Sequence, residues 1–185
     1  MIVMMYNIYG VMNITGYAGK SYSIDDLRRK ATEYSYGENI LTRKNFEGVY
    51  NNTSKENLNN EVWVRLSQKG WNRYFVSNLG RVRWLNDENE LVSLVQVDEL
   101  KKDGTPHYGY LVFDPKQLPG KIQHNYYVWR LIAMGFLGLS DRDKGMIVHH
   151  INNNGYDCTP ENLILVTDEQ HKEIHPFLRK NKNEF

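Results

Sequence analysis

The chain has 185 residues, enough for one good-sized domain whose core needs no disulfide support. Lys and Arg total 23 against 22 Asp and Glu, so bulk charge gives no global attraction to nucleic acid, and any nucleic-acid surface must be local. A single cysteine, Cys158, excludes an internal disulfide framework and any zinc site of paired cysteines, and it suits a reducing cytosol.

The apolar opening, residues 1–12, lacks the features of a targeting segment. It has no basic leader and no small-residue cleavage signal, and Asn7 and Gly10 interrupt it. It is therefore interpreted as neither a signal peptide nor a transmembrane span, and no other long apolar run follows. We expect a cytoplasmic protein that has no membrane partner.

A short helix is predicted within the otherwise weakly patterned first sixty residues. The sequence Ser-Ile-Asp-Asp places Ser23 as N-cap and Asp26 at the N3 position, so a helix should run from about residue 24 to residue 34. Residues 49–60 are rich in Asn, Ser, Thr and charged residues, which is typical of a linker. Residues 1–60 are thus interpreted as a partly helical N-terminal arm.

From residue 61 the sequence changes to the aromatic and β-branched residues that favour strands. Residues 74–77 and 81–85 should form a hairpin, because the intervening Asn-Leu-Gly supplies turn residues. Further strands are expected at 91–97 and 108–113 with a turn at 102–104, and an additional strand is considered at 121–127.

A run of basic residues without acids lies between Val62 and Asn86, interleaved with Trp, Tyr and Phe. Local positive charge beside aromatic rings is what contact with nucleic-acid phosphates requires. The alternative is that the aromatic residues form the core of a small sheet while the arginines keep its outer face hydrated, and we favour that core role for Trp63 and Phe75. For the basic residues we favour phosphate contact, because the run breaks an otherwise balanced charge pattern. They are Arg65, Lys69, Arg73, Arg81 and Arg83.

A helix is predicted from about Val128, in the apolar sequence VWRLIAMGFLG, with Gly138 at its end. Its apolar residues should pack against the sheet. Arg130 is the single charge in this run, so its side chain must reach solvent, an acidic partner or a phosphate. We include Arg130 among the expected DNA contacts, with an arginine extended into solvent as the alternative. Residues 61–138 are thus interpreted as a β-rich, DNA-contacting module with a core helix.

The C-terminal region, residues 139–185, contains four of the six histidines. Residues 146–150 and 163–166 have strand character and should pair across a long loop. Thr167 then begins Thr-Asp-Glu-Gln, a capping-box pattern that predicts a helix from about Asp168.

Histidines from that strand and that helix can form one metal site. His171 and His175 are spaced by four, so they lie one helical turn apart on a single face and can hold one ion. A third histidine from the strand would leave positions open for water and phosphate, as in catalytic sites. Adjacent strand residues point to opposite sides, so His149 and His150 cannot share one role. One ligates, and the other is available as a general base, whose ordinary pKa of about 6.5 suits proton removal.

The same residues resemble a known family, the HNH or ββα-metal nucleases, and are especially similar to the colicin-type DNases. The order that carries this resemblance is His149-His150, then Asn162-Leu163, then His171-x-x-x-His175. The resemblance implies an α+β fold, with a small antiparallel sheet module followed by a ββα-metal (His-Me finger) motif and preceded by a short helical N-terminal region.

Upstream segments resemble the homing-enzyme branch of this family. Residues 61–83 and 108–138 are similar to the NUMOD4-like accessory module and linking segment of phage and intron HNH homing endonucleases. Residues 23–46 resemble the small helical repeats of some of these enzymes, in which a second helix begins at a Thr; the alternative is a helical arm packed on the main domain. A phage or mobile-element protein acting in a host cell is therefore implied.

The family pattern implies a role for each polar residue of the C-terminal region. His149, His171 and His175 become the metal ligands, and His150 becomes the base that activates water against the scissile phosphate. Asn162 is expected to hold the two strands in register and to keep His150 oriented. The metal would neutralise charge on the pentacovalent phosphate and stabilise the leaving 3′ oxygen, which gives 5′-phosphate products from double-stranded DNA.

Departures from the homing-enzyme pattern bear on the metal and on the helices. That branch usually has Asp at the position of His149; a carboxylate shell favours Mg²⁺ or Mn²⁺, whereas three imidazoles favour Zn²⁺ or Ni²⁺, so one divalent ion of these four is expected. Trp129 stands where that branch has a histidine, so any role of that histidine is lost here. Pro176 follows the last ligand and removes a helix hydrogen-bond donor, so the ligand helix should kink or end there.

Other functions fit the histidines less well. A closed, structural zinc site in a DNA-binding module is the main alternative, and a non-enzymatic DNA-binding regulator with the same fold is another. The ordered HH, NL and HxxxH elements favour catalysis over both. A zinc protease is excluded, because its motif needs Glu directly after the first histidine, where this chain has Lys172.

Overall fold

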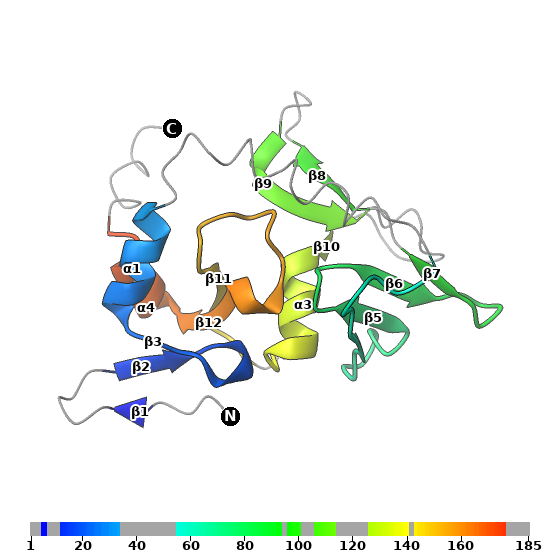
Figure 1. Cartoon of the computed structure of the whole chain (residues 1–185), viewed down its shortest axis with the longest axis horizontal. Helices are drawn as coiled ribbons and strands as arrows, with labels where there is room; N and C mark the ends of the chain where they lie inside the picture. The colour runs from blue at the N-terminus through cyan, green and yellow to red at the C-terminus, as the bar shows by residue number, and fades with distance from the viewer. Residues whose placement is uncertain are drawn as a thin grey trace.

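Figure 1 shows the computed structural model of the chain, in which residues 5–6, 12–33, 55–93, 96–100, 106–113, 126–140 and 143–176 are described. These residues form a mixed α+β fold of small antiparallel sheets and short helices, as the sequence predicts. Within them, no helix has the length and apolar content needed to cross a membrane.

An N-terminal unit contains one small sheet and one helix. Strands β1 (Met5–Tyr6), β2 (Met12–Thr15) and β3 (Ser21–Tyr22) pair antiparallel in that order, with a 3-10 turn at Tyr17–Gly19. Helix α1 (Ile24–Glu33) follows.

The predicted cap of α1 is confirmed. The Asp26 backbone N–H donates to Ser23 Oγ at 3.1 Å, and the Ser23 backbone N–H donates to Asp26 Oδ2 at 3.1 Å. Two of the donors that a helix start leaves unpaired are thereby satisfied. The second helix considered for residues 34–46 lies outside the described residues.

A four-stranded antiparallel sheet follows residue 60. Its strands are β4 (Trp63–Arg65), β5 (Tyr74–Ser77), β6 (Val82–Leu85) and β7 (Leu91–Ser93), in chain order. The predicted hairpin is confirmed as β5 and β6, and Gly80 in its turn has φ of +80°, a conformation that glycine adopts without strain.

A second sheet has the order β10–β9–β8, with β8 at Gln96–Leu100, β9 at Pro106–Phe113 and β10 at Tyr126–Tyr127. The single strand predicted at 91–97 is wrong. Residues 91–93 pair with β6, whereas β8 pairs with β9, so the two halves of that segment belong to different sheets. The turn expected at 102–104 and residues 121–125 lie outside the described residues.

Helix α3 (Val128–Phe136) lies between the four-stranded sheet and the C-terminal motif (Figure 1). Its buried residues share one hydrophobic core with Val76 of β5 and with Leu163 of the C-terminal motif. Gly138 follows the helix with φ of +72°, as predicted for a helix end. This core contains residues from both sides of residue 138. The domain boundaries expected near residues 60 and 138 stay predictions.

Gly135 of α3 allows the helix to approach the sheet closely. A Cβ built there would lie 2.5 Å from Val76 Cγ2 and 3.3 Å from Leu66 Cδ2. Val76 is fully buried and its β-branched side chain is stiff, so it cannot move aside easily. A glycine inside a helix is explained here by packing rather than by backbone freedom.

Gly135→Ala should therefore destabilise the protein, although Ala is the better helix former by about 1 kcal/mol. The added methyl overpacks the core, which costs about 1–3 kcal/mol, and chemical denaturation would measure the loss. Adding Val76→Ala removes the methyl that clashes with the new alanine. The double variant should therefore lose less stability than the sum of the losses of the two single variants. Strict additivity would show that the two side chains do not compete for this space.

The C-terminal region forms the predicted ββα motif. Strand β11 (Met146–His150) pairs antiparallel with β12 (Leu163–Thr167), with His149 opposite Ile164 and His150 opposite Leu163. Helix α4 (Asp168–Ile174) begins at a complete capping box between Thr167 and Gln170, as predicted. It ends before His175, consistent with the stop expected from Pro176.

The N-terminal unit covers the face of the ββα motif that α3 leaves uncovered. Ile14 of β2 and Leu27 of α1 form a second core with Ile164 of β12 and Ile174 of α4. Figure 1 shows α1 and α4 side by side on the opposite side of β11 and β12 from α3. Strands β11 and β12 are therefore held between two hydrophobic layers.

Candidate active site

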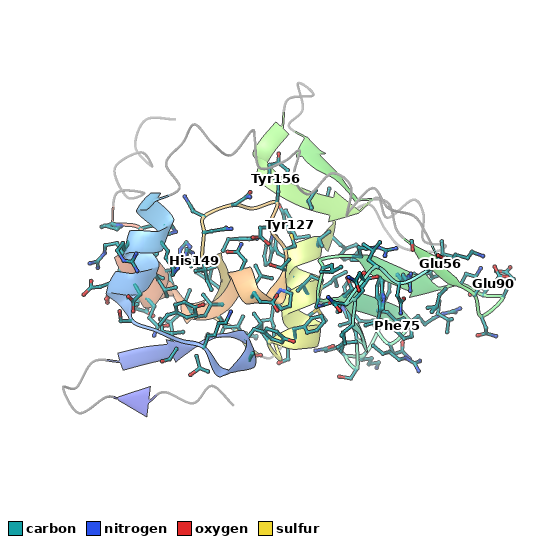
Figure 2. All side chains as sticks on the ribbon, viewed as in Figure 1. Glu56, Phe75, Glu90, Tyr127, His149 and Tyr156 are labelled. Atoms are coloured by element: carbon teal, nitrogen blue, oxygen red, sulfur yellow. The ribbon has the colours of Figure 1, made fainter. Side chains whose placement is uncertain are left out.

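Three histidines converge at the junction of β11 and α4. The centroid of the His149 ring lies 5.6 Å from that of His171 and 5.0 Å from that of His175, and the last two rings are 5.0 Å apart. One nitrogen from each ring lies within 4.8 Å of the other two. Figure 2 shows His149 on the side of the molecule occupied by α1 and α4, away from the four-stranded sheet.

The secondary structure explains this convergence. His149 projects from β11 on the side that faces α4, while His171 lies in the last turn of α4. The His175 backbone N–H donates to the His171 carbonyl at 3.1 Å, so one helical turn still separates the two residues although His175 lies just beyond the helix. The i, i+4 spacing therefore brings both rings to one point, as the sequence predicts.

The environment keeps these imidazoles neutral. Burial lowers the pKa of His149 to about 2, helped by the neighbouring His175 and His171, and burial followed by His171 lowers the pKa of His175 to about 4. The pKa of His171 is also lowered by burial, although Asp168 opposes the shift. Neutral imidazole is the form that binds a metal, so no proton has to be displaced at neutral pH.

The three histidines fit a divalent metal ion. The His149 side chain is 3% exposed, and its buried Nε2 has no hydrogen-bond partner among the described residues. A buried polar atom of this kind is costly unless a partner is supplied. Three nitrogen ligands converging on one point are the donor set of a catalytic zinc-type site, in which further positions stay open.

His150 lies on the other side of β11, as strand alternation requires. His150 is 7% exposed, and its ring makes a T-shaped contact with Trp129 on α3, with centroids 6.4 Å apart and planes at 83°. Trp129 stacks in turn on Tyr127 at 5.2 Å. Burial lowers the pKa of His150 to about 4, so the imidazole is unprotonated at neutral pH but is a weaker base than a histidine with the ordinary pKa of about 6.5.

Asn162 closes the loop between β11 and β12. Its Oδ1 accepts from the Asn152 backbone N–H at 2.9 Å, and its Nδ2 donates to the Asp157 carbonyl at 2.9 Å. Its own carbonyl accepts from the Ile151 backbone N–H at 2.8 Å. Ile151, directly after β11, is thereby joined to Asn162, directly before β12. A contact at this place is what the role expected for Asn162 in strand register requires.

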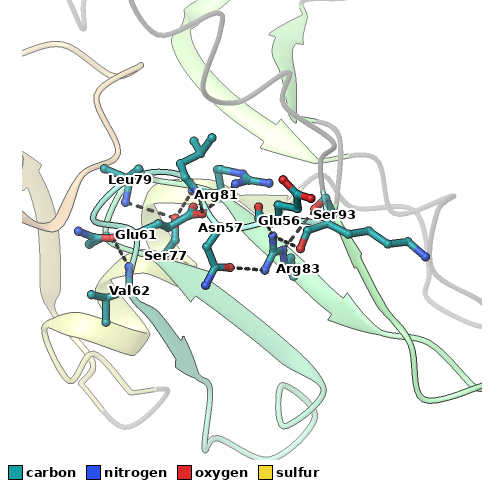
Figure 3. A network of polar contacts seen from close by, with 12 residues as sticks. Glu56, Asn57, Glu61, Val62, Ser77, Leu79, Arg81, Arg83 and Ser93 are labelled. Atoms are coloured by element: carbon teal, nitrogen blue, oxygen red, sulfur yellow. Dashed lines mark hydrogen bonds and ion pairs between the residues drawn. The ribbon is translucent and has the colours of Figure 1, made fainter.

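Two of the predicted DNA-contact residues lie in the interior instead. Arg81 is 2% exposed and its Nη1 donates to Glu61 Oε2 at 2.8 Å, while Arg83 is 4% exposed and donates to Asn57 Oδ1 at 3.0 Å (Figure 3). Both guanidinium groups also lie over Trp63, at 5.5 and 4.1 Å from its centroid. This placement removes Arg81 and Arg83 from the expected phosphate-contact surface, because their charged groups are enclosed by protein.

The other four residues predicted to contact DNA lie at the surface. Arg65 and Lys69 are exposed, and Arg65 donates to the Asn72 carbonyl at 2.7 Å. Arg73 is half-buried and pairs with Asp87 at 2.8 Å, and Arg130 is exposed on the first turn of α3. We call these four residues the basic surface: Arg65, Lys69, Arg73 and Arg130.

Asp157 is a residue of the site that the sequence interpretation missed. Its Oδ2 accepts from Asn152 Nδ2 at 2.9 Å, and its Oδ1 accepts from Thr159 Oγ1 at 2.7 Å. Asp157 thus fixes the loop that Asn162 closes. The sequence Asp-Cys-Thr-Pro contains the signal, because Asp and Thr before a proline favour local side-chain hydrogen bonds and a helical turn.

Part of the chain is similar to known proteins. Residues 126–173 match the family model described as HNH endonuclease. The chain is 28% identical over 107 residues to an uncharacterized HNH endonuclease of Acanthamoeba polyphaga mimivirus; the match covers 58% of this chain and 24% of that protein. A solved structure of DNA binding and cleavage by the HNH homing endonuclease I-HmuI has a TM-score of 0.42 and 26% identity, covering 60% of this chain and 56% of the other.

The family match contains α3, both strands of the ββα motif and most of α4, including His149, His150, Asn162 and His171. The chain spans about a quarter of the length of the viral relative. Residues 126–173 are therefore similar to HNH endonucleases.

Proposed function

We propose that the chain is a metal-dependent endonuclease that hydrolyses phosphodiester bonds in double-stranded DNA. The observation that carries this proposal is the convergence of His149, His171 and His175 on one point, with His150 adjacent in the same strand. The HNH family match over residues 126–173, which contain His149, His150 and His171, supports it. In this proposal the site is of the colicin type. All three metal ligands are imidazoles, because His149 stands where the homing-enzyme branch usually has Asp.

The three converging histidines would hold one divalent ion, with Zn²⁺ or Ni²⁺ favoured by imidazole ligands and Mg²⁺ or Mn²⁺ as the alternatives. When bound, the ion would supply Lewis-acid stabilisation of the charge on the reacting phosphate and on the leaving 3′ oxygen. The protein contributes neutral, converging nitrogens, held by β11 and α4, that need no proton loss before they bind.

His150 would act as the general base. Its unprotonated imidazole accepts a proton from the attacking water, whose oxygen forms a bond to phosphorus as the bond to the 3′ oxygen breaks. The leaving 3′ oxygen takes a proton from solvent, and His150 later returns its proton to solvent, so the products carry a 5′ phosphate and a 3′ hydroxyl. The Trp129 ring packs against the His150 ring at nearly a right angle, and Asn162 fixes the loop that starts one residue later, so both would limit the orientations of His150.

The four-stranded sheet, as the NUMOD4-like accessory module, and α3 would contact DNA through the basic surface defined above. Its exposed members carry local positive charge in a chain whose total charge is nearly balanced. Because Arg73 pairs with Asp87, its phosphate contact should be weaker than those of Arg65 and Lys69.

Replacing Arg65 and Lys69 together with Ala should weaken DNA binding across all sequences and reduce the salt dependence. Removal of one cation that touches a phosphate lowers the slope of log K against log salt by about 1, so a reduction of about 2 is expected. Binding titrations between low and moderate salt measure it. Lys20→Ala, at an exposed lysine of the N-terminal unit, is the control. An unchanged slope in the double variant would remove the sheet from the proposed DNA surface.

A structural metal site in a non-catalytic DNA-binding module is the second candidate function. Structural zinc sites are closed by four protein ligands. Among the described residues the cluster contains three, which favours the open, catalytic arrangement.

A cleavage assay on supercoiled plasmid separates the two functions. The protein is stripped with a chelator and then supplied with Zn²⁺, Ni²⁺, Mg²⁺ or Mn²⁺ in turn. At least one ion should restore nicking or linearisation, with none in the stripped sample. Absence of cleavage with every ion, in a protein that still binds metal and DNA, would favour the structural module.

A further inference from the structure

We propose that Arg28 of α1 is a positioning residue for His175, which makes the N-terminal unit part of the metal site. This inference rests on the proposed metal binding. It concerns a segment, residues 12–33, that lies outside the family match at 126–173.

His175 needs support because its helix does not continue through it. Helix α4 has seven residues and ends at Ile174, and His175 has φ of −116° and ψ of 65°, which is not helical. The next residue, Pro176, has no N–H with which to extend the helical bonding and restricts the residue before it. Only the bond from the His175 N–H to the His171 carbonyl, at 3.1 Å, comes from the helix itself.

Helix α1 holds the two residues that precede His175. Arg28 Nε donates to the Glu173 carbonyl at 3.0 Å, across 145 positions of sequence. Ile174 is 1% exposed and packs in the core that contains Leu27, the residue next to Arg28. One residue is thus fixed through its carbonyl and the other through its side chain, which together set the direction in which the backbone enters His175.

The Arg28 guanidinium is itself held in place. Its Nη1 donates to Asp25 Oδ1 at 2.8 Å, one turn earlier in α1. A guanidinium at a helix C-terminus also complements the partial negative charge of the last carbonyls and satisfies one that the helix leaves without a partner. The contact therefore has an electrostatic component as well as a geometric one.

The test is metal affinity in the full chain, without DNA. In a zinc titration, Arg28→Ala should bind about 10-fold more weakly than the original protein, since removing a group that orients ligands commonly costs 10-fold or more. The Co²⁺-loaded variant should also show an altered visible absorption band, because His175 no longer keeps one geometry. Arg28→Lys, which retains a donor and a charge, should recover part of the affinity.

Arg29→Ala is the matched control. Arg29 is the next residue of the same helix, its side chain is 60% exposed, and it lies 3.9 Å from Asp26 of its own helix. This variant should bind Zn²⁺ as the original protein does. Denaturation of each metal-free variant shows whether any loss of affinity exceeds a loss of folded protein.

The outcomes separate this inference from the proposed function. If the original protein binds Zn²⁺ and Arg28→Ala binds it equally well with an unchanged Co²⁺ band, the positioning role is wrong while the nuclease proposal stands. If Arg29→Ala weakens binding as much as Arg28→Ala, the effect is general to α1 and the inference is also wrong. If the original protein binds no divalent ion, the proposed metal site fails first.

Discussion

Replacing His150 with Ala should reduce the rate of DNA cleavage by about 100-fold or more, while metal binding stays near that of the original protein. The reason is that the variant loses the group proposed to accept the proton of the attacking water, and general-base catalysis typically contributes 10²–10⁴-fold. His150 faces Trp129 rather than the three converging histidines, so the metal site should survive its loss. Single-turnover cleavage of a plasmid measures the rate.

Zinc titration of the same variant provides the control. Retained affinity with lost cleavage assigns the effect to the chemistry rather than to the fold. His149→Ala should behave in the opposite way, losing affinity and cleavage together, because it removes the most buried of the three converging nitrogens. Cleavage by His150→Ala at the original rate would show that another group activates the water.

Arg81→Ala should lower the free energy of unfolding by about 3–5 kcal/mol, which is the usual cost of breaking a buried ion pair by removing one partner. The side chains of Arg81 and Glu61 are 3% and 0% exposed and are joined at 2.8 Å. The variant leaves the Glu61 carboxylate enclosed without its partner. Urea denaturation measures the loss, which is a large part of the 5–15 kcal/mol that stabilises a typical domain.

The double variant Arg81→Ala with Glu61→Ala separates charge from packing. It removes both charges, so it should be more stable than Arg81→Ala alone. If the single variant were as stable as the original protein but bound DNA weakly, Arg81 would belong to the DNA surface that its sequence context suggested.

Local patterns predicted the elements that depend on near neighbours. The capping boxes at Ser23 and Thr167 each place an acceptor three residues from a donor, so sequence spacing alone determines the contact. The approach of His171 in α4 to His175 just beyond it was predictable for the same reason, because one helical turn brings residues four apart together. The resemblance to HNH endonucleases was also confirmed over residues 126–173, whereas the NUMOD4-like module and the colicin-type motif stay predictions.

Contacts between distant segments were not predictable. The acid-free run suggested that Arg81 and Arg83 face solvent, yet Glu61 lies just before that run and pairs with Arg81 across 20 positions. Arg83 donates to the backbone carbonyls of Lys55 and Glu56. Every residue has a backbone carbonyl, so the sequence gives no sign of which ones will accept. The composition of the segment is compatible both with phosphate contact at the surface and with pairing in the interior. The tertiary fold decides between the two for each arginine.

In the proposed nuclease, the position of α3 would set how far the cleaved bond lies from the DNA contact. This helix has nine residues, about 13 Å, and carries Gly135 against Val76 of the sheet near one end and Trp129 against His150 near the other. A closely packed helix of this length acts as a rigid spacer. A duplex lying on the sheet would then meet the histidines at a constant number of base pairs from its contact, so the helix would set the distance between the site that is gripped and the bond that is cut.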